Sequence, residues 1–566
     1  MSYTYFDLIK NVFDDFYSNN YWSTALNVIQ LEDLFSFCIF LKKTFLGLYL
    51  AHLLCIYGII QLLAKVVSII GQRTTILYLK STLLLLVCII FYSIITYICQ
   101  NIYIFYLQNT NFLFDALLTD NYYILIYIFI FSFYGLYLYN QAILKIKNKL
   151  IWDINSEILL LLNIATYLNL KIITCGNLLY FIILIESLTL LLIVVCVSMG
   201  FLKEDLKSAE EAGFKLYINN AVSTGFLLLG ISLIYGCTGL INIADISFFL
   251  NNILNTGFSS NFFFNIKDFL LIIGFIFFLV GIFTKMMQSP FHLWAKDIYE
   301  GSSFYFTGYL ATISKVGILF FFVNSILLFN KCDILMNLCL YLGLFSTFIG
   351  ILGSLQQKKF KSFIAYTSIA AIGPLLIICG VSPYIYNINI ISNIVLPYIL
   401  SYIGIVLFLF IIIGRLGKIH IYNYNTIKHS KIKTIRKFTF IQLKELSEFA
   451  GLWFKHKSLT ILILILLLTL IAIPPFFNFL LKTYILLVFV KTSNLVIAFI
   501  FLLYGVIGCL YYLKIIKLMI FDHVNNHIYI LKTTFFANLI STTCILFLTI
   551  GFMYPKIVLN LFFNLN

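Results

Sequence analysis

Charged side chains are scarce in this 566-residue chain: they make up 10% of it, while 62% of the residues are hydrophobic and the mean hydropathy is +1.02. A soluble domain has about 25% charged residues, so the composition excludes a soluble globular protein. Seven prolines and 29 glycines are too few for a disordered or fibrous chain. What remains is a polytopic membrane protein.

Motifs for cofactors and metals are also missing. The twelve cysteines include no C-x-x-C pair, which removes support for an iron–sulfur cluster, a zinc site or a disulfide framework. No Rossmann fingerprint, P-loop or haem-type motif occurs. His523 and His527 have a spacing that suits a metal, but Asp522 is the only carboxylate near them. We therefore expect the chain to bind no metal and no redox cofactor.

Arginine is limited to Arg73, Arg415 and Arg436, whereas Lys, Asn, Ile, Phe and Tyr abound. This usage is typical of AT-rich genomes, which are often organellar. Residues 1–22 contain three aspartates and no arginine, unlike a signal or transit peptide. We expect a protein made inside the organelle that it serves.

Fourteen apolar runs approach or exceed the roughly 20 residues that a membrane-spanning helix needs. They are too long and too uniformly apolar for barrel strands. We therefore expect an all-α polytopic membrane protein with about 14 transmembrane helices. The runs are 46–65, 82–107, 122–144, 157–174, 178–200, 217–236, 268–290, 304–328, 334–353, 363–382, 391–414, 459–490, 495–513 and 534–553.

The net charge of +15 falls almost entirely in the loops on one side of this predicted topology. It is therefore a topology signal that places this side in the cytoplasm or the matrix, and no nucleic-acid partner is expected. One loop, 415–457, dominates the signal. It is either a surface helix that binds another subunit or anionic lipid such as cardiolipin, or a solvated loop; we favour the loop.

Four charged residues lie inside predicted helices, each far from any other charge in the sequence: Glu186, Lys285, Lys315 and Lys482. A charge at this depth costs at least about 2.5–3.5 kcal/mol, and by default it marks an ion path. The alternatives are a structural ion pair, or a lysine whose amine reaches the membrane surface. Four such residues in one chain favour a functional path.

Two of these lysines lie next to prolines. Lys285 precedes Pro290, and Lys482 follows Pro474 and Pro475. Proline interrupts a helix, and broken backbone inside a membrane is tolerated only where it is buried in protein or lines water. A matched pair of interrupted helices indicates an internal repeat with an ion site. A buried lysine suits such a site, because desolvation lowers the pKa of an amine and lets it release and retake a proton.

The segment from Pro290 to Gly301, PFHLWAKDIYEG, resembles the P-F-H-x-W-x-x-D-x-Y-x-G motif of NADH dehydrogenase subunit 2, the antiporter-like membrane subunit of respiratory complex I. Sister subunits 4 and 5 usually read P-F-H-x-W-L-P-D-A, so Ile298 and Tyr299 favour subunit 2. Ala472 departs from the family, which usually has glycine there. Further matches, in family order, are IESL (185–188), EAGFK (211–215), KSFIAYTSIA (361–370), EFAGL (448–452), IPP (473–475) and YYLK (511–514).

The resemblance implies two inverted five-helix repeats, with helices 7 and 12 broken. The implied organisation is an N-terminal extension that is interfacial or subunit-bound (1–45), three helices (46–150), a first repeat (151–330), a second repeat with a basic matrix loop (331–520) and a last helix (521–566).

The resemblance also implies a proton relay. Glu186 would pair with Lys285, Lys315 would pass the proton laterally, and Lys482 would be the exit-side carrier. Lys215 is similar to a family lysine that modulates the site, although a plain surface lysine fits its position equally well. His292 would either join the relay or cap the broken backbone.

The implied activity is that of a non-redox core subunit of proton-translocating NADH:ubiquinone oxidoreductase in the inner mitochondrial membrane. NADH, FMN, iron–sulfur clusters and ubiquinone would bind to other subunits, and the neighbours would be similar to subunits 4 and 4L. Two other hypotheses stay open: a stand-alone secondary cation/proton antiporter, and a scaffold of helices that has lost its ion path.

Overall fold

A computed structural model describes the chain at residues 156–173, 175–199, 206–255, 266–328, 332–381, 388–414, 416–428, 431–442, 444–522 and 529–530. All of them belong to one compact unit, Gly58–Asn566. The extension (1–45), the first three predicted helices (46–150) and the last (534–553) lie outside the described residues. The total of 14 helices and the two inverted repeats therefore stay predictions.

Every predicted apolar run within the described residues forms one helix or two consecutive helices. The helices are α5 (Ser156–Ile173), α6 (Leu178–Ser198), α7 (Leu206–Thr238), α8 (Ile243–Asn255), α9 (Ile266–Met286), α10 (Leu293–Gly301), α11 (Phe304–Ala311), α12 (Ile313–Leu328), α13 (Asp333–Gln356), α14 (Phe360–Val381), α15 (Ile388–Ile413), α16 (Leu452–Lys455), α17 (Lys457–Ile471), α18 (Phe477–Lys491) and α19 (Leu495–Ile520), with a short 3₁₀ helix, η3, at Leu446–Phe449.

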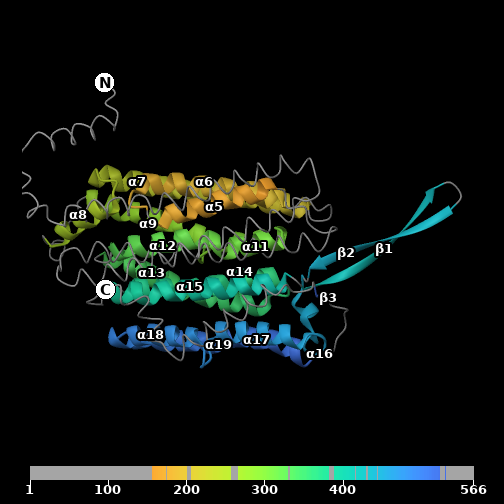
Figure 1. The fold of residues 1–566 in the computed structure, drawn as a ribbon. Helices are drawn as coiled ribbons and strands as arrows, with labels where there is room; N and C mark the ends of the chain where they lie inside the picture. The colour runs from red at the N-terminus through yellow and green to blue at the C-terminus, as the bar shows by residue number, and fades with distance from the viewer. Residues whose placement is uncertain are drawn as a thin grey trace, which may run out of the picture. The chain divides into compact units, whose positions relative to one another are not determined.

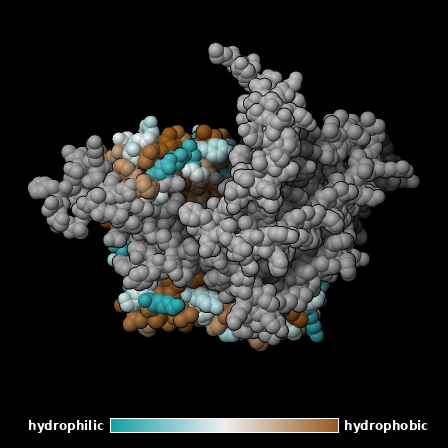
Figure 2. Space-filling model, turned by 60° about the vertical axis from the view of Figure 1, so that its left-hand side comes forward, coloured by the Kyte–Doolittle hydropathy of each residue, from teal (hydrophilic) through white to brown (hydrophobic). Residues whose placement is uncertain are grey.

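The long helices run side by side (Figure 1), and within the described residues eight helical stretches are long and apolar enough to cross a membrane. Much of their surface is apolar. In Figure 2 the coloured surface is largely brown, with a few teal side chains among it. Such a surface suits lipid, and the chain is a multi-pass membrane protein.

Two helix pairs pack at very short range through glycines. On α9, Gly274 and Gly281 face α7, and on α13, Gly343 and Gly350 face α14. In both helices the two glycines are seven residues apart, which places them on one face, two turns from each other. Small residues let helix backbones approach closely inside a membrane, where apolar burial contributes little to association.

The basic loop is the exception to the helical prediction. Strands β1 (Leu416–Lys428) and β2 (Lys431–Gln442) form an antiparallel hairpin, and β3 (Tyr529–Ile530) pairs with β1. The surface helix considered for this segment is therefore wrong at residues 416–428 and 431–442, and the connection forms a hairpin. Isoleucines, tyrosines and phenylalanines alternate with polar residues in much of this segment, a period-two pattern that favours strands.

Candidate functional site

The first helix break separates α9 from α10. Met287 has a φ of 64°, its amide donates to the Thr284 carbonyl at 3.3 Å, and the Gln288 amide donates to the Phe283 carbonyl at 3.0 Å. These two bonds form a Schellman motif, which ends a helix by satisfying carbonyls of its last turn. The helix thus ends at Met286, four residues before Pro290, and the predicted interruption is present.

The second break, between α17 and α18, uses the same backbone geometry. Ala472 has a φ of 66°, its amide donates to the Thr469 carbonyl at 3.1 Å, and the Ile473 amide donates to the Leu468 carbonyl at 3.4 Å. Pro474 and Pro475 follow directly. Both interrupted helices therefore close with a residue in the left-handed region, and in neither case is this residue a glycine.

Lys285 lies in the last turn of α9 and is 7% exposed. Its Nζ donates to Asn220 Oδ1 of α7 at 3.1 Å. Glu186 of α6 is near enough for its charge to act on Lys285, but the two form no ion pair within 4.0 Å. Helix α7 packs against both α6 and α9. It supplies the direct partner of Lys285, which is a neutral amide and not the Glu186 carboxylate.

Lys315 lies in the first turn of α12 and is 4% exposed. Its Nζ donates to Ser368 Oγ of α14 at 3.0 Å and lies 5.8 Å from the centre of the Tyr299 ring. A cation over an aromatic face is favourable, the more so away from water. In the described part of the chain no carboxylate lies within 4.0 Å of this amine.

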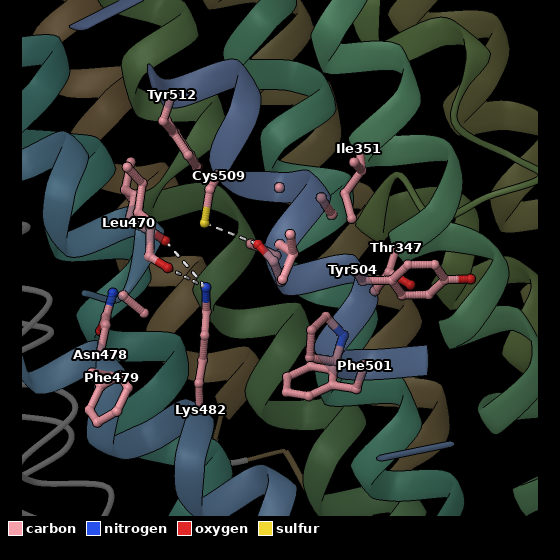
Figure 3. Close-up of a pocket in the computed structure, with 18 of the residues that line it drawn as sticks. Thr347, Ile351, Leu470, Asn478, Phe479, Lys482, Phe501, Tyr504, Cys509 and Tyr512 are labelled. Carbon is pink, nitrogen blue, oxygen red and sulfur yellow. Dashed lines mark hydrogen bonds between the residues drawn. The ribbon is translucent and has the colours of Figure 1, made fainter. Parts of the chain in front are cut away.

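Lys482 reaches back from α18 to the end of the other half-helix. Its Nζ donates to the carbonyls of Leu470 at 3.4 Å and Ile471 at 3.2 Å, as the dashed lines in Figure 3 show. One turn earlier on α18, Asn478 Nδ2 donates to the Thr469 carbonyl at 3.1 Å. The last carbonyls of a helix lack partners and carry partial negative charge, so this position stabilises a cation.

A cavity of about 400 Å³ surrounds the Lys482 side chain. Its walls come from α13, α14, α15, α17, α18 and α19, and most of them are apolar. The polar residues in its lining are Thr347, Thr367, Tyr398, Tyr402, Asn478, Thr483, Tyr504, Tyr511 and Tyr512, together with Cys509. A space of this size holds several waters, each of which occupies about 30 Å³ in the liquid.

Lys215 lies apart from these buried amines. It forms ion pairs with Glu211 at 2.7 Å and with Asp297 of α10 at 2.8 Å, and its side chain is 39% exposed. Nearby, Lys359 pairs with Glu300, and the Lys361 amine donates to the Ser302 carbonyl. Ion pairs exposed to solvent contribute little to stability. Lys215 is thus a partly exposed lysine whose ion pair with Asp297 connects α7 to α10.

His292 occupies the N-cap position of α10 and is 9% exposed. Its side chain makes no capping hydrogen bond to α10, but it interacts with the backbone of Pro290 in the break, which fits the structural role considered for it. The ring lies edge-on to Tyr366, with 6.1 Å between the ring centres. Its Nδ1 is buried and has no partner among the described residues.

The structure brings each of the three lysines to a separate polar site, and no hydrogen bond between described residues joins Lys285, Lys315 and Lys482 directly. The residues that sequence reasoning missed are their neutral partners, Asn220 and Ser368. The sequence does mark Asn220 as a candidate polar site, because two consecutive asparagines interrupt the apolar run of α7. Ser368 carried none, since serine is common in membrane helices.

Comparison with known proteins gives a family match over most of the described part of the chain. Residues 175–508 match the family model described as "NADH:quinone oxidoreductase/Mrp antiporter, TM". The chain is 32% identical over 352 residues to NADH-quinone oxidoreductase subunit N of Pelagibacter ubique, and 27% identical over 360 residues to the subunit N of Wolbachia sp. subsp. Brugia malayi. Each alignment covers 62% of this chain, and 66% and 67% of the two relatives respectively.

Solved structures agree on the fold. A chain of respiratory complex I from Thermus thermophilus superposes with a TM-score of 0.60 at 17% identity, over 89% of this chain and 98% of that one. At this identity the likeness concerns the fold alone.

Proposed function

Since the chain belongs to the NADH:quinone oxidoreductase/Mrp antiporter family of membrane subunits, we propose that it translocates protons as a membrane subunit of NADH:ubiquinone oxidoreductase. The observation that carries the proposal is the set of three lysines, two buried and one half-buried, whose amines bond to neutral acceptors: an amide, a hydroxyl and two carbonyls.

Neutral partners weigh against a structural reading of these lysines. A structural buried charge is normally held by a carboxylate, and removing one member of such a pair costs about 3–5 kcal/mol. An amine that donates to a neutral oxygen keeps a hydrogen bond whether it is protonated or not, because neutral –NH₂ still has two N–H groups. Such a lysine can therefore alternate between its two protonation states without losing its place.

In the proposed path Lys285 exchanges its proton under the influence of Glu186, Lys315 carries it laterally, and Lys482 releases it. The two broken helices supply the polar backbone of the path, since the carbonyls that end α17 hold the Lys482 ammonium. Moving one charge against 100 mV costs about 2.3 kcal/mol. A change of about two pKa units in a buried amine supplies that free energy.

The proposal assigns the redox chemistry to other subunits, which would bind NADH, FMN, the iron–sulfur clusters and ubiquinone. It places the chain in the inner mitochondrial membrane as an organelle-encoded protein, which its amino-acid usage favours. The proposed neighbours in the complex are similar to subunits 4 and 4L. Anionic lipid such as cardiolipin is proposed to bind at the basic segment 415–457.

The test replaces Lys315 or Lys482 by methionine in the assembled enzyme. We expect proton pumping coupled to NADH oxidation to fall about tenfold or more, the equivalent of at least 1.4 kcal/mol. Electron transfer from NADH to a soluble acceptor, which bypasses the membrane part, should persist. The control is Lys514→Met, because Lys514 is an exposed lysine on α19. Full pumping by both test variants would favour the scaffold hypothesis.

The second candidate is the stand-alone cation/proton antiporter, which the description of the family model also covers. Cation-dependent proton movement by the purified chain alone, in vesicles without NADH, would support it. Recovery of the chain only within a large NADH-oxidising assembly supports the first proposal.

A further inference from the structure

Two tyrosines lie one turn apart on α15 and differ in what their hydroxyls contact. The Tyr398 hydroxyl donates to the Ala371 carbonyl of α14 at 3.1 Å. Tyr402 is 8% exposed, and among the described residues its buried hydroxyl makes no hydrogen bond of regular geometry; its nearest polar contact is the Thr367 side chain. Both side chains line the cavity that contains Lys482.

A buried hydroxyl without a partner is costly. Leaving such a group unsatisfied costs about 1–3 kcal/mol, and phenylalanine would fill the same space without this cost. A tyrosine that served only packing would therefore be a poor choice at this position. A hydroxyl can both donate and accept a hydrogen bond, which phenylalanine cannot.

The position of Tyr402 connects two of the lysine sites. Its hydroxyl interacts electrostatically with Tyr299, whose ring lies beneath the Lys315 ammonium, and with Tyr512 in the cavity wall. Helix α14 links the same two places through consecutive residues: Ser368 accepts the Lys315 hydrogen bond, and Thr367 lines the cavity. Tyr402 thus lies where the Lys315 site meets the Lys482 cavity.

We propose that the Tyr402 hydroxyl passes the proton between Lys315 and the Lys482 cavity, an inference that rests on the proposed function. The oxygen accepts a proton on a lone pair from the Lys315 side and releases its own proton to water in the cavity. Lys315 loses one proton, Lys482 gains one, and Tyr402 is neutral before and after. Rotation of the hydroxyl about its C–O bond resets the step.

The test compares Tyr402→Phe with Tyr398→Phe in the assembled enzyme, measuring the pumping rate per assembled complex and the thermal stability of each variant. Tyr402→Phe should slow pumping about tenfold and leave stability nearly unchanged, because it removes a hydroxyl that makes no hydrogen bond of regular geometry. Tyr398→Phe should lower stability, because it breaks a formed hydrogen bond, and slow pumping less than Tyr402→Phe does.

The inference is overturned if Tyr402→Phe pumps at the wild-type rate per complex, or if its lost activity only follows lost assembly. Lys315→Met and Lys482→Met, measured in the same series, separate this result from failure of the proposed function. If those variants lose pumping while Tyr402→Phe keeps it, only the role of Tyr402 fails. If all three pump normally, the proton path itself is absent.

Discussion

Ala472 ends α17 with a φ of 66°, in the left-handed region, where a side chain costs about 1–2 kcal/mol and glycine avoids that penalty. We therefore expect Ala472→Gly to stabilise the protein by about 0.5–1 kcal/mol once the greater chain entropy of glycine is subtracted. The gain should appear as a higher temperature of thermal inactivation of the detergent-solubilised enzyme.

The matched control for this residue is Ala498→Gly, inside α19. Ala498 is buried in a regular helix, where glycine costs about 1 kcal/mol, so this variant should be less stable than wild type. Equal effects of the two substitutions, or a loss of stability in Ala472→Gly, would contradict the assignment of strain to this break.

Single residues also show how far sequence reasoning reached. Lys285, Lys315 and Lys482 could be identified because each is a lone charge in an apolar run, and membrane physics makes such charges conspicuous. Their partners could not. Asn220 and Ser368 are 65 and 53 residues away from the lysines they bond, and they are neutral, so no charge pattern points to them.

Helices α13 and α14 approach each other closely at Gly350, where an added Cβ would lie 2.5 Å from the backbone nitrogen of Ala370. Gly350→Ala should therefore force the helices apart and destabilise the protein by about 1–3 kcal/mol. The displaced helix carries Ser368, two residues from this contact. Pumping should fall together with stability, both measured on the assembled enzyme.

Gly225→Ala is the control at this scale, because Gly225 also lies inside a long helix, α7, but has nothing within 4 Å of its added Cβ. Alanine is the better helix former by about 1 kcal/mol, so this variant should be neutral or stabilised. If Gly350→Ala behaves in the same way, the close approach of α13 and α14 does not support the site.

The elements themselves were predictable where apolar runs are long and prolines mark the interruptions, as at Pro290 and Pro474. Three features were not. The interruption at Thr312 between α11 and α12 has no proline, α8 is shorter than a membrane span, and the β1–β2 hairpin lies in a segment whose charges drew attention to topology. In each case the surrounding apolar run or the loop charge was the more conspicuous feature of the sequence, and it pointed to a membrane span or to topology instead.

Across the whole described unit, basic residues gather at one end of the helices. Three contacts connect segments far apart in sequence at this end: the Leu446 amide to the Lys358 carbonyl at 2.8 Å, the Gly451 amide to the Leu518 carbonyl at 3.2 Å, and Ser208 Oγ to the Gly301 carbonyl at 3.4 Å. The β1–β2 hairpin extends from the same end, and α18 lies toward the opposite end in Figure 1.

The positive-inside rule then assigns this basic end to the matrix or cytoplasmic side, from which the proposed path would take up protons. Two exposed lysines mark the two ends, Lys358 before α14 and Lys491 at the end of α18. In sealed vesicles of known orientation, we expect a membrane-impermeant maleimide to modify Lys358→Cys only from the matrix or cytoplasmic side and Lys491→Cys only from the other. Peptide mass spectrometry identifies the modified cysteine, and detergent should expose both. Modification of both from one side would contradict the topology, and with it the direction in which Lys482 releases its proton.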